Sequence, residues 1–179
     1  MKMIILINGP FGVGKTSVAT LLNENLENYI IFDPEEIGSM LRNIVTEDIQ
    51  YQKEKTDDFQ DIILWKELTV LIAAKLMATY NTNLIIPMTI YKLEYFNYII
   101  SELKKIDPQV YHFCLLAQRQ TIAERLLERG EKIGSWPFEQ IDKCLYSFEH
   151  NFEMFGQIIF TDCLSVKDIT SAILNTVLE

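Results

Sequence analysis

Phosphate chemistry is the first function that the residue types and their spacing indicate. An apolar run, residues 3–7, ends at Asn8 and leads into Gly-Pro-Phe-Gly-Val-Gly-Lys-Thr at 9–16. This octapeptide has the GxxxxGK[ST] spacing of a phosphate-binding loop, and a helix-forming segment (16–26) follows it. A predicted strand before and a predicted helix after are the setting that this loop requires. The sequence therefore predicts a nucleoside triphosphate site.

The positions of the loop have separate physical roles. Glycines allow a tight turn that points successive backbone N–H groups at phosphate oxygens. The positive end of the following helix adds to this field. We expect Lys15 to reach the β- and γ-phosphates of ATP and the Thr16 hydroxyl to bind Mg²⁺. The predicted ATP-binding residues are Gly9, Pro10, Phe11, Gly12, Val13, Gly14, Lys15, Thr16 and Ser17.

A carboxylate follows the second predicted strand. Asp33 comes directly after the apolar residues 30–32 and before Pro34, a pattern typical of a helix N-cap. It also lies at the carboxyl end of a strand, where it could hold a Mg²⁺-bound water or accept a proton from a substrate hydroxyl. A cap uses only one carboxylate oxygen, so both roles are compatible. We predict that Asp33 is a catalytic and metal-linked residue.

Two arginines belong to a later helical segment. Arg125 and Arg129 are four residues apart, so they share one helix face. Such a face can stack on a purine ring and reach phosphates, although Glu124 and Glu128 offer an ordinary salt-bridged surface instead. We predict that both arginines stabilise the transferring phosphoryl group. The Gly-containing segment near 130–137 is then a short lid that excludes water on closure.

A third group of residues suits a small-molecule acceptor. Asp58, Gln60 and Trp65 place polar side chains next to one large ring, a mixture typical of a sugar-like or nucleoside-like ligand. Arg42 could contact the edge of the same ligand, or remain a solvated surface arginine. Thr89 ends the predicted strand 83–88 and could orient a water. The predicted substrate-binding residues are Arg42, Asp58, Gln60, Trp65 and Thr89.

One expected metal ligand is missing from this pattern. Many P-loop proteins carry an acidic residue at the end of the strand beside the first, where it helps to hold Mg²⁺. The corresponding residues 84–89 contain no carboxylate. Metal binding would then depend on Thr16 and Asp33.

The order of the elements predicts the fold that positions these residues. Short apolar strands at 3–7, 29–32, 83–88, 110–116 and 157–160 alternate with helices at 15–27, 34–45, 57–80, 92–105, 121–129, 137–151 and 165–178. This alternation predicts an α/β fold, a doubly wound five-stranded parallel sheet of the P-loop small-molecule kinase type. With no repeat and no Pro/Gly-rich linker, we expect one domain over 1–179.

Charge and cysteine content narrow the partners. The net charge of −9 argues against a nucleic acid, whose backbone needs clustered Lys and Arg, and against anionic lipid. The three cysteines include no CxxC pair, which favours reduced thiols and a cytoplasmic protein. The apolar stretches are too short for a transmembrane segment. We expect the partner to be a small-molecule substrate.

The chain resembles the ATP-binding tunicamycin-resistance proteins, which are related to nucleoside monophosphate, gluconate and shikimate kinases. The similarity is carried by Asn-Gly-Pro-Phe-Gly-Val-Gly-Lys-Thr at 8–16, Asp-Pro-Glu at 33–35, Asp-Asp-Phe-Gln at 57–60, Leu-Trp at 64–65 and Ile-Pro-Met-Thr-Ile at 86–90. Further matches follow at 94–97, 135–136, 140–142 and 161–166. The resemblance implies ATP binding and protection against tunicamycin, a nucleoside antibiotic with a uridine head, sugars and a fatty acyl tail.

The sequence leaves three functions open. The first is an enzyme, an ATP-dependent phosphotransferase in which Lys15, Thr16 and Mg²⁺ position ATP and Asp33 activates a substrate hydroxyl. The second is an ATP-dependent protein that sequesters the antibiotic without modifying it, which the missing acidic strand end favours. The third is a kinase of another small hydroxylated metabolite. Neither the physiological substrate nor the oligomeric state follows from the sequence.

Overall fold

The computed structural model of the chain describes residues 2–178 and contains one five-stranded parallel sheet. The strands are β1 (Ile4–Asn8), β2 (Tyr29–Ile31), β3 (Asn83–Pro87), β4 (Val110–Leu116) and β5 (Gln157–Phe160). Their order across the sheet is β2-β3-β1-β4-β5, with every neighbouring pair parallel. The predicted doubly wound α/β fold is confirmed.

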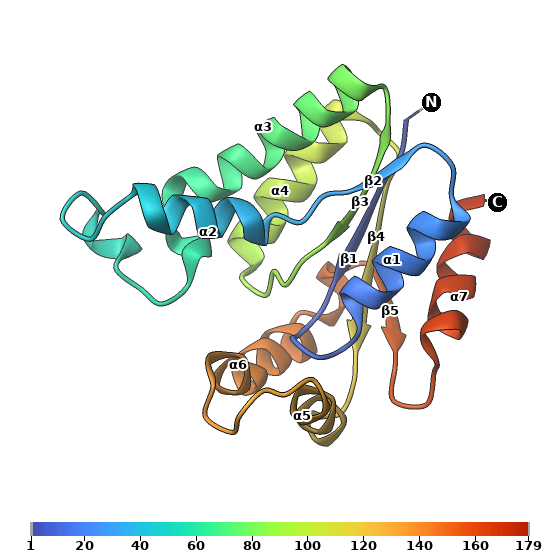
Figure 1. Cartoon of the computed structure of the whole chain (residues 1–179). Helices are drawn as coiled ribbons and strands as arrows, with labels where there is room; N and C mark the ends of the chain where they lie inside the picture. Colours follow the sequence, from blue (N-terminus) through green and yellow to red (C-terminus); the bar gives the residue numbers. More distant parts are fainter. Residues whose placement is uncertain (1, 179) are drawn as a thin grey trace.

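Residues 2–178 also form seven α-helices and three short 3₁₀ turns, which join the strands or, in the case of α7, follow the last one (Figure 1). The helices are α1 (Lys15–Asn25), α2 (Glu35–Ile44), α3 (Ile63–Tyr80), α4 (Leu93–Ile106), α5 (Arg119–Glu128), α6 (Trp136–His150) and α7 (Val166–Leu178). The 3₁₀ turns are η1 (Gln52–Glu54), η2 (Phe59–Asp61) and η3 (Phe152–Met154). Within residues 2–178, none of these helices combines the length and the hydrophobicity that a membrane-spanning helix requires.

The sheet has a hydrophobic core on each face, because successive strand residues point to opposite sides. Ile4 and Leu6 face a core that includes α3 and α4, whereas Ile5 and Ile7 face a core that includes α1 and α7. All four side chains are fully buried. Figure 1 shows α3 and α4 on one side of the sheet and α1 and α7 on the other. Burial on both faces explains why the strands are continuously apolar.

One helix begins later than its sequence predicts. The prediction of a single helix over 57–80 is wrong for residues 57–62, because α3 starts at Ile63. The Asp58 side chain accepts a hydrogen bond from the Gln60 N–H and starts η2 instead. Such local side-chain bonds compete with helix formation. The segment before α3 is therefore not α-helical, and its Gln60 side chain donates to the Thr89 carbonyl just after β3.

Candidate functional site

The side chain of Asn8, at the end of β1, fixes the start of the phosphate-binding loop. The sequence analysis did not predict a role for this residue. The buried Asn8 amide donates to the Ile90 carbonyl (2.9 Å) and accepts from the N–H groups of Gly9 and Ile90 (both 2.8 Å). A Cβ at Gly9 would lie 2.2 Å from the Leu115 carbonyl oxygen, so only glycine fits there. These contacts hold the loop against the residues that follow β3 and against β4.

Lys15 lies at the centre of the site. Its side chain is buried and donates a 2.8 Å hydrogen bond to the Pro10 carbonyl, and its ammonium is 5.5 Å from the centroid of the Phe11 ring. Burial lowers the Lys15 pKa to about 8, and the nearby Glu35 carboxylate opposes this shift. A buried, underhydrated ammonium in a phosphate-binding loop gains most from an anionic ligand.

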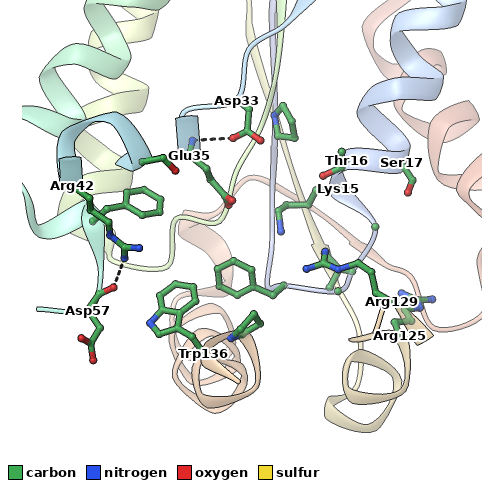
Figure 2. Close-up of a pocket in the computed structure, with 18 of the residues that line it drawn as sticks. Lys15, Thr16, Ser17, Asp33, Glu35, Arg42, Asp57, Arg125, Arg129 and Trp136 are labelled. Carbon is green, nitrogen blue, oxygen red and sulfur yellow. Dashed lines mark hydrogen bonds between the residues drawn. The ribbon is translucent and has the colours of Figure 1, made fainter. Parts of the chain in front are cut away.

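A cleft of about 1720 Å³ crosses the carboxyl ends of the strands, with the loop at its centre. Its P-loop end, as we call it, is lined by loop residues 11–17, Arg125, Glu128, Arg129 and residues 164–166. Its α2 end is lined by Ser39, Arg42, residues 45–47, Gln50, residues 55–57 and Phe59. Figure 2 shows Arg42 and Asp57 on one side and Arg125 and Arg129 on the other, with Lys15 between them. Ligand sites of doubly wound sheets lie at this edge.

Most of the predicted nucleotide-binding residues line the cleft. Phe11 to Ser17 do so, and the Thr16 and Ser17 side chains at the start of α1 are exposed. Gly9 and Pro10 do not line it: both are buried, Gly9 against β4 and Pro10 beneath Lys15. Gly14 adopts φ 99° directly before α1, a conformation that turns the chain into the helix.

The two predicted arginines line the cleft in different ways. Arg125 is tied to Thr161, with hydrogen bonds of 2.9 Å to its hydroxyl and 2.7 Å to its carbonyl. Arg129 lies closer to the centre of the site, where its charge affects the pKa values of both Lys15 and Glu35. In Figure 2 the Arg129 guanidinium points toward Lys15. Arg129 pairs with Glu131 at 3.4 Å, so its guanidinium is held by one long contact, whereas that of Arg125 is held by two short hydrogen bonds.

The segment predicted to be a lid connects α5 to α6. It contains two glycines with positive φ, Gly130 and Gly134, and nothing lies within 4 Å of a Cβ built on either. Ile133 between them is 81% exposed. At the end of the segment, the Trp136 ring packs edge-to-face on the Phe11 ring of the loop, with centroids 5.1 Å apart. One aromatic contact therefore joins the segment to the phosphate-binding loop.

Two carboxylates lie where β2 leads into α2. Oδ1 of Asp33 accepts a 2.9 Å hydrogen bond from the Glu35 N–H, so Asp33 satisfies a free donor at the helix start and leaves Oδ2 unused. Glu35 also lines the cleft, although the sequence analysis did not select it. Burial raises the pKa of both carboxyl groups, and the Lys15 charge partly opposes both shifts.

The α2 end contains one preorganised arginine. Arg42 donates a hydrogen bond to the Asp57 carbonyl, and its guanidinium lies 5.4 Å from the centroid of the Phe59 ring. The Phe59 ring packs against Gly38, where an added Cβ would lie 2.2 Å from the Phe59 Cδ2 atom. The ring also makes an edge-to-face contact with Trp65. The stacked guanidinium faces a cleft that is open to a polar ligand.

Four predicted substrate-binding residues do not line the cleft, and each has an internal partner instead. Asp58 forms a 3.1 Å ion pair with Lys92. Gln60 donates to the Thr89 carbonyl at 2.8 Å, and both of these side chains are buried. Trp65 is fully buried in the core, where its indole N–H donates to the Pro34 carbonyl at 3.0 Å. Through these internal contacts, the residues hold the segment before α3 in place.

The residues missed by the sequence analysis alternate with those it selected. Asp57 and Phe59 line the cleft, whereas Asp58 and Gln60 between and after them turn inward. This alternation was missed because residues 57–62 were predicted to be helical. In a helix, residues three and four apart share a face, so Asp57 and Phe59 would not have been expected to point the same way. Lining residues in the loop after α2, such as Thr46 and Gln50, carry no motif that could have identified them.

The site has few candidate metal ligands. No group of three or more His, Cys, Asp or Glu side chains that could hold a metal occurs between residues 2 and 178. The Thr16 hydroxyl and Asp33 both line the cleft, but Thr89 does not. Mg²⁺ that arrives with a nucleotide needs only one or two protein ligands, because phosphates and waters supply the others. This donor set fits such an ion.

Comparison with known proteins agrees with the geometry. The model of a family described as an AAA domain matches residues 5–145. Among solved structures, the tunicamycin resistance protein of Deinococcus radiodurans is 27% identical, with 98% of this chain and 96% of that chain covered and a TM-score of 0.77. No curated protein sequence matches the chain.

Two kinases share the fold at lower identity. A gluconokinase from Sinorhizobium meliloti 1021 is 19% identical, covering 98% of this chain and 91% of that chain with a TM-score of 0.68. A shikimate kinase from Acinetobacter baumannii in complex with shikimate is 14% identical, covering 99% and 94% with a TM-score of 0.67. At these identities the likeness concerns the fold alone. The predicted resemblance to tunicamycin-resistance and kinase-like P-loop proteins is confirmed.

Proposed function

The chain belongs to the AAA-domain family, and from this premise we propose that it is an ATP-dependent small-molecule kinase. It transfers the γ-phosphoryl group of Mg-ATP to a hydroxyl of a nucleoside- or sugar-like compound, and tunicamycin is the first candidate. The observation that carries the proposal is the cleft of about 1720 Å³, which has a phosphate-binding loop at its centre and room for a second ligand at its α2 end.

The residues at the P-loop end bind and orient ATP. Backbone N–H groups of the loop and the start of α1 face the phosphates. Lys15 leaves the Pro10 carbonyl and donates to phosphate oxygens, which stabilises its protonated form. Arg129 neutralises the charge of the phosphoryl group during transfer. Arg125, held by Thr161, borders the far end of the nucleotide.

Mg²⁺ that accompanies ATP would be held by the Thr16 hydroxyl and by Asp33, which both line the cleft. It would neutralise the negative charge that develops on the phosphate oxygens during transfer. Asp33 suits this role because its Oδ2 oxygen remains available while Oδ1 is held by the Glu35 N–H.

The α2 end binds the acceptor. Arg42, fixed by Asp57 and Phe59, donates to polar groups of the acceptor, and the Phe59 ring offers an apolar face to a sugar or base. The segment 130–137 acts as a lid and excludes water when both ligands are bound. Water competes with the acceptor hydroxyl for the phosphoryl group, so excluding water favours transfer over hydrolysis.

Sequestration of the antibiotic without chemistry is the second candidate. It is favoured by the end of β3, where Thr89 replaces an acidic residue and is itself turned away from the cleft. A slow or absent chemical step would still leave a protein that binds ATP and tunicamycin together. A kinase of another hydroxylated metabolite remains the third candidate.

Product analysis separates the three. Tunicamycin and a panel of nucleosides and sugars are incubated with the protein and Mg-ATP and analysed by mass spectrometry. A gain of one phosphoryl group on tunicamycin supports the first candidate, and a gain on another compound supports the third. Binding of tunicamycin without any product supports sequestration. Expression in a sensitive bacterium should raise its tolerance to tunicamycin in the first two cases.

A further inference from the structure

We propose that Lys92 is a positioning residue of the α2 end: it anchors the segment 56–61, which presents Asp57 and Phe59 to the cleft. Lys92 does not line the cleft, so it acts through these residues and not on the ligand itself. This inference rests on the proposed function and deepens it, because it names the residue that fixes where the acceptor is bound.

Lys92 lies between two carboxylates of the segment. Its ammonium is 2.5 Å from Oδ1 of Asp61 and 3.1 Å from Oδ2 of Asp58. Neither carboxylate has another ion-pair partner within residues 2–178, and their side chains are only 13% and 10% exposed. Two negative charges that are mostly removed from water destabilise a segment unless a cation lies between them. Lys92 supplies that cation.

Neutral groups complete the anchor at Asp61. The Tyr95 hydroxyl donates to its Oδ1 at 2.8 Å, and the Thr56 hydroxyl donates to its Oδ2 at 2.6 Å. Burial raises the pKa of Asp61, but the hydrogen bonds from Lys92, Thr56 and Tyr95 outweigh this effect and hold the pKa below its ordinary value. Asp61 is therefore charged at neutral pH and depends on Lys92 for its counter-charge.

The residues just before Lys92 are fixed to the phosphate-binding loop. Asn8, at the start of that loop, exchanges two hydrogen bonds with the backbone of Ile90, at 2.9 and 2.8 Å. The buried Gln60 side chain donates to the neighbouring Thr89 carbonyl at 2.8 Å. The segment is thus anchored on the same stretch of chain that holds the loop. This stretch sets the position of the α2 end relative to the P-loop end.

The anchored segment carries groups that face the acceptor. Asp57 and Phe59 line the cleft, and they alternate with the inward-facing Asp58 and Gln60. The Asp57 carbonyl accepts a hydrogen bond from Arg42, whose guanidinium lies 5.4 Å from the centroid of the Phe59 ring. When the inward side chains lose their anchor, the outward ones lose their position with them. The phosphate-binding loop keeps its own hydrogen bonds.

Lys66 offers a matched control for Lys92. Their side chains are 22% and 28% exposed, and their ammonium groups lie 5.6 and 5.4 Å from the centroid of the same Tyr95 ring. The only ion pair of Lys66 within residues 2–178 is a 3.9 Å contact with the exposed Glu94. Lys66→Met therefore removes the same charge without breaking the anchor.

The experiment compares the wild type with Lys92→Met, Lys92→Arg, Asp61→Asn and Lys66→Met. Hydrogen–deuterium exchange of the ligand-free proteins measures the opening of residues 56–61 and of the loop residues 9–17. Steady-state kinetics measure kcat and the KM values for ATP and for tunicamycin, or for the panel compound that the wild type phosphorylates. Urea unfolding measures general stability.

Lys92→Met should speed exchange in residues 56–61 and leave residues 9–17 unchanged. It should raise the KM for the acceptor by up to about 100-fold, because a misplacement of about 1 Å can cost that much, and leave the KM for ATP unchanged. Lys92→Arg keeps a positive charge between the carboxylates and should restore most of the wild-type KM. Lys66→Met should match the wild type.

Asp61→Asn provides a milder break of the same anchor. It removes the shorter of the two ion pairs and leaves no carboxylate unpaired, since Lys92 keeps Asp58. It should raise the KM for the acceptor by a smaller factor than Lys92→Met, so the role remains testable even where Lys92→Met does not fold.

Unchanged exchange in residues 56–61 of a folded Lys92→Met would overturn the anchor. An unchanged KM for the acceptor would also overturn the positioning role, even with a lower kcat, because a purely structural loss reduces the active fraction without moving the acceptor. Failure of the wild type to phosphorylate any compound would overturn the proposed function instead. The exchange measurement still decides whether Lys92 anchors the segment, so the two failures are distinguishable.

Discussion

The two ends of the cleft are built on different principles. At the P-loop end, one contiguous stretch of sequence supplies backbone donors, and Asn8 and Gly9 fix it to the sheet. At the α2 end, side chains from α2, the loop after it and the segment before α3 meet only through tertiary contacts. In the proposed kinase, the first end therefore binds phosphate in general, and the second end selects the acceptor.

Loss of the central ammonium should give the largest effect and should be confined to one end. Lys15→Ala is expected to weaken Mg-ATP binding by about 3 kcal/mol, as for a charge-assisted hydrogen bond in a buried site. Arg42→Ala should leave ATP binding unchanged and weaken binding of the acceptor. Calorimetric titration of both variants with both ligands measures this. Equal effects of the two substitutions on ATP would contradict the division of the cleft.

A methyl group at Gly38 should damage the α2 end only. Alanine usually stabilises a helix relative to glycine by about 1 kcal/mol. Here its Cβ would lie 2.2 Å from the Phe59 ring, and such overpacking costs about 1–3 kcal/mol. We expect Gly38→Ala to lower the free energy of unfolding in urea and to weaken acceptor binding, while ATP binding is kept.

Two further variants test the cause of that effect. Phe59→Leu combined with Gly38→Ala should restore part of the stability, because it removes the ring that the new methyl group meets. Ser39→Ala, at the next and exposed position of α2, should cost no stability. An equal loss of stability in Gly38→Ala and Ser39→Ala would show that the Gly38–Phe59 contact is not responsible.

The two tryptophans should respond in opposite ways. Trp65→Phe leaves the buried Pro34 carbonyl without its 3.0 Å donor and is expected to cost about 1–3 kcal/mol of stability, with little effect on ligand affinity. Trp136→Phe alters a residue that lines the cleft and should change ligand affinity with little loss of stability. Urea unfolding and calorimetry decide. A ligand-specific defect in Trp65→Phe would restore it to the acceptor site.

The smallest effect concerns pH. Because the Lys15 pKa in the free protein is about 8, ATP affinity should be constant below this value and fall as pH rises through it, by at most tenfold per pH unit. The ligand-free protein should respond in the opposite direction. Between about 8 and the ordinary Lys value of 10.5 the unfolded chain binds more protons at this residue, so its contribution to stability rises with pH. A similar pH dependence of ATP affinity in Lys15→Ala would assign the effect to another group.

The same contrast explains what the sequence could predict. The strands and the phosphate-binding loop follow from local patterns, apolar runs and fixed glycine spacing, and their residues lie where these patterns predict. The α2 end does not follow from such patterns, because the direction of Asp58 depends on Lys92, and that of Gln60 on Thr89, tens of residues away. A tryptophan ring often binds a sugar or a base, which is why Trp65 was predicted to contact the ligand. Its contacts with Phe59 and Pro34, which show it to be a core residue, do not follow from the sequence pattern. Glu35 was hidden because a carboxylate in a first helical turn is ordinary.

Simultaneous occupation of the two ends is the most direct test. Tunicamycin is titrated calorimetrically into the wild-type protein, with and without a saturating, non-hydrolysable ATP analogue and Mg²⁺. A nucleotide at the P-loop end and an acceptor at the α2 end should bind together, so the tunicamycin affinity should be unchanged or higher with the analogue bound. Loss of tunicamycin binding in proportion to the analogue concentration would mean that both ligands compete for one place, and would contradict a cleft with separate nucleotide and acceptor ends.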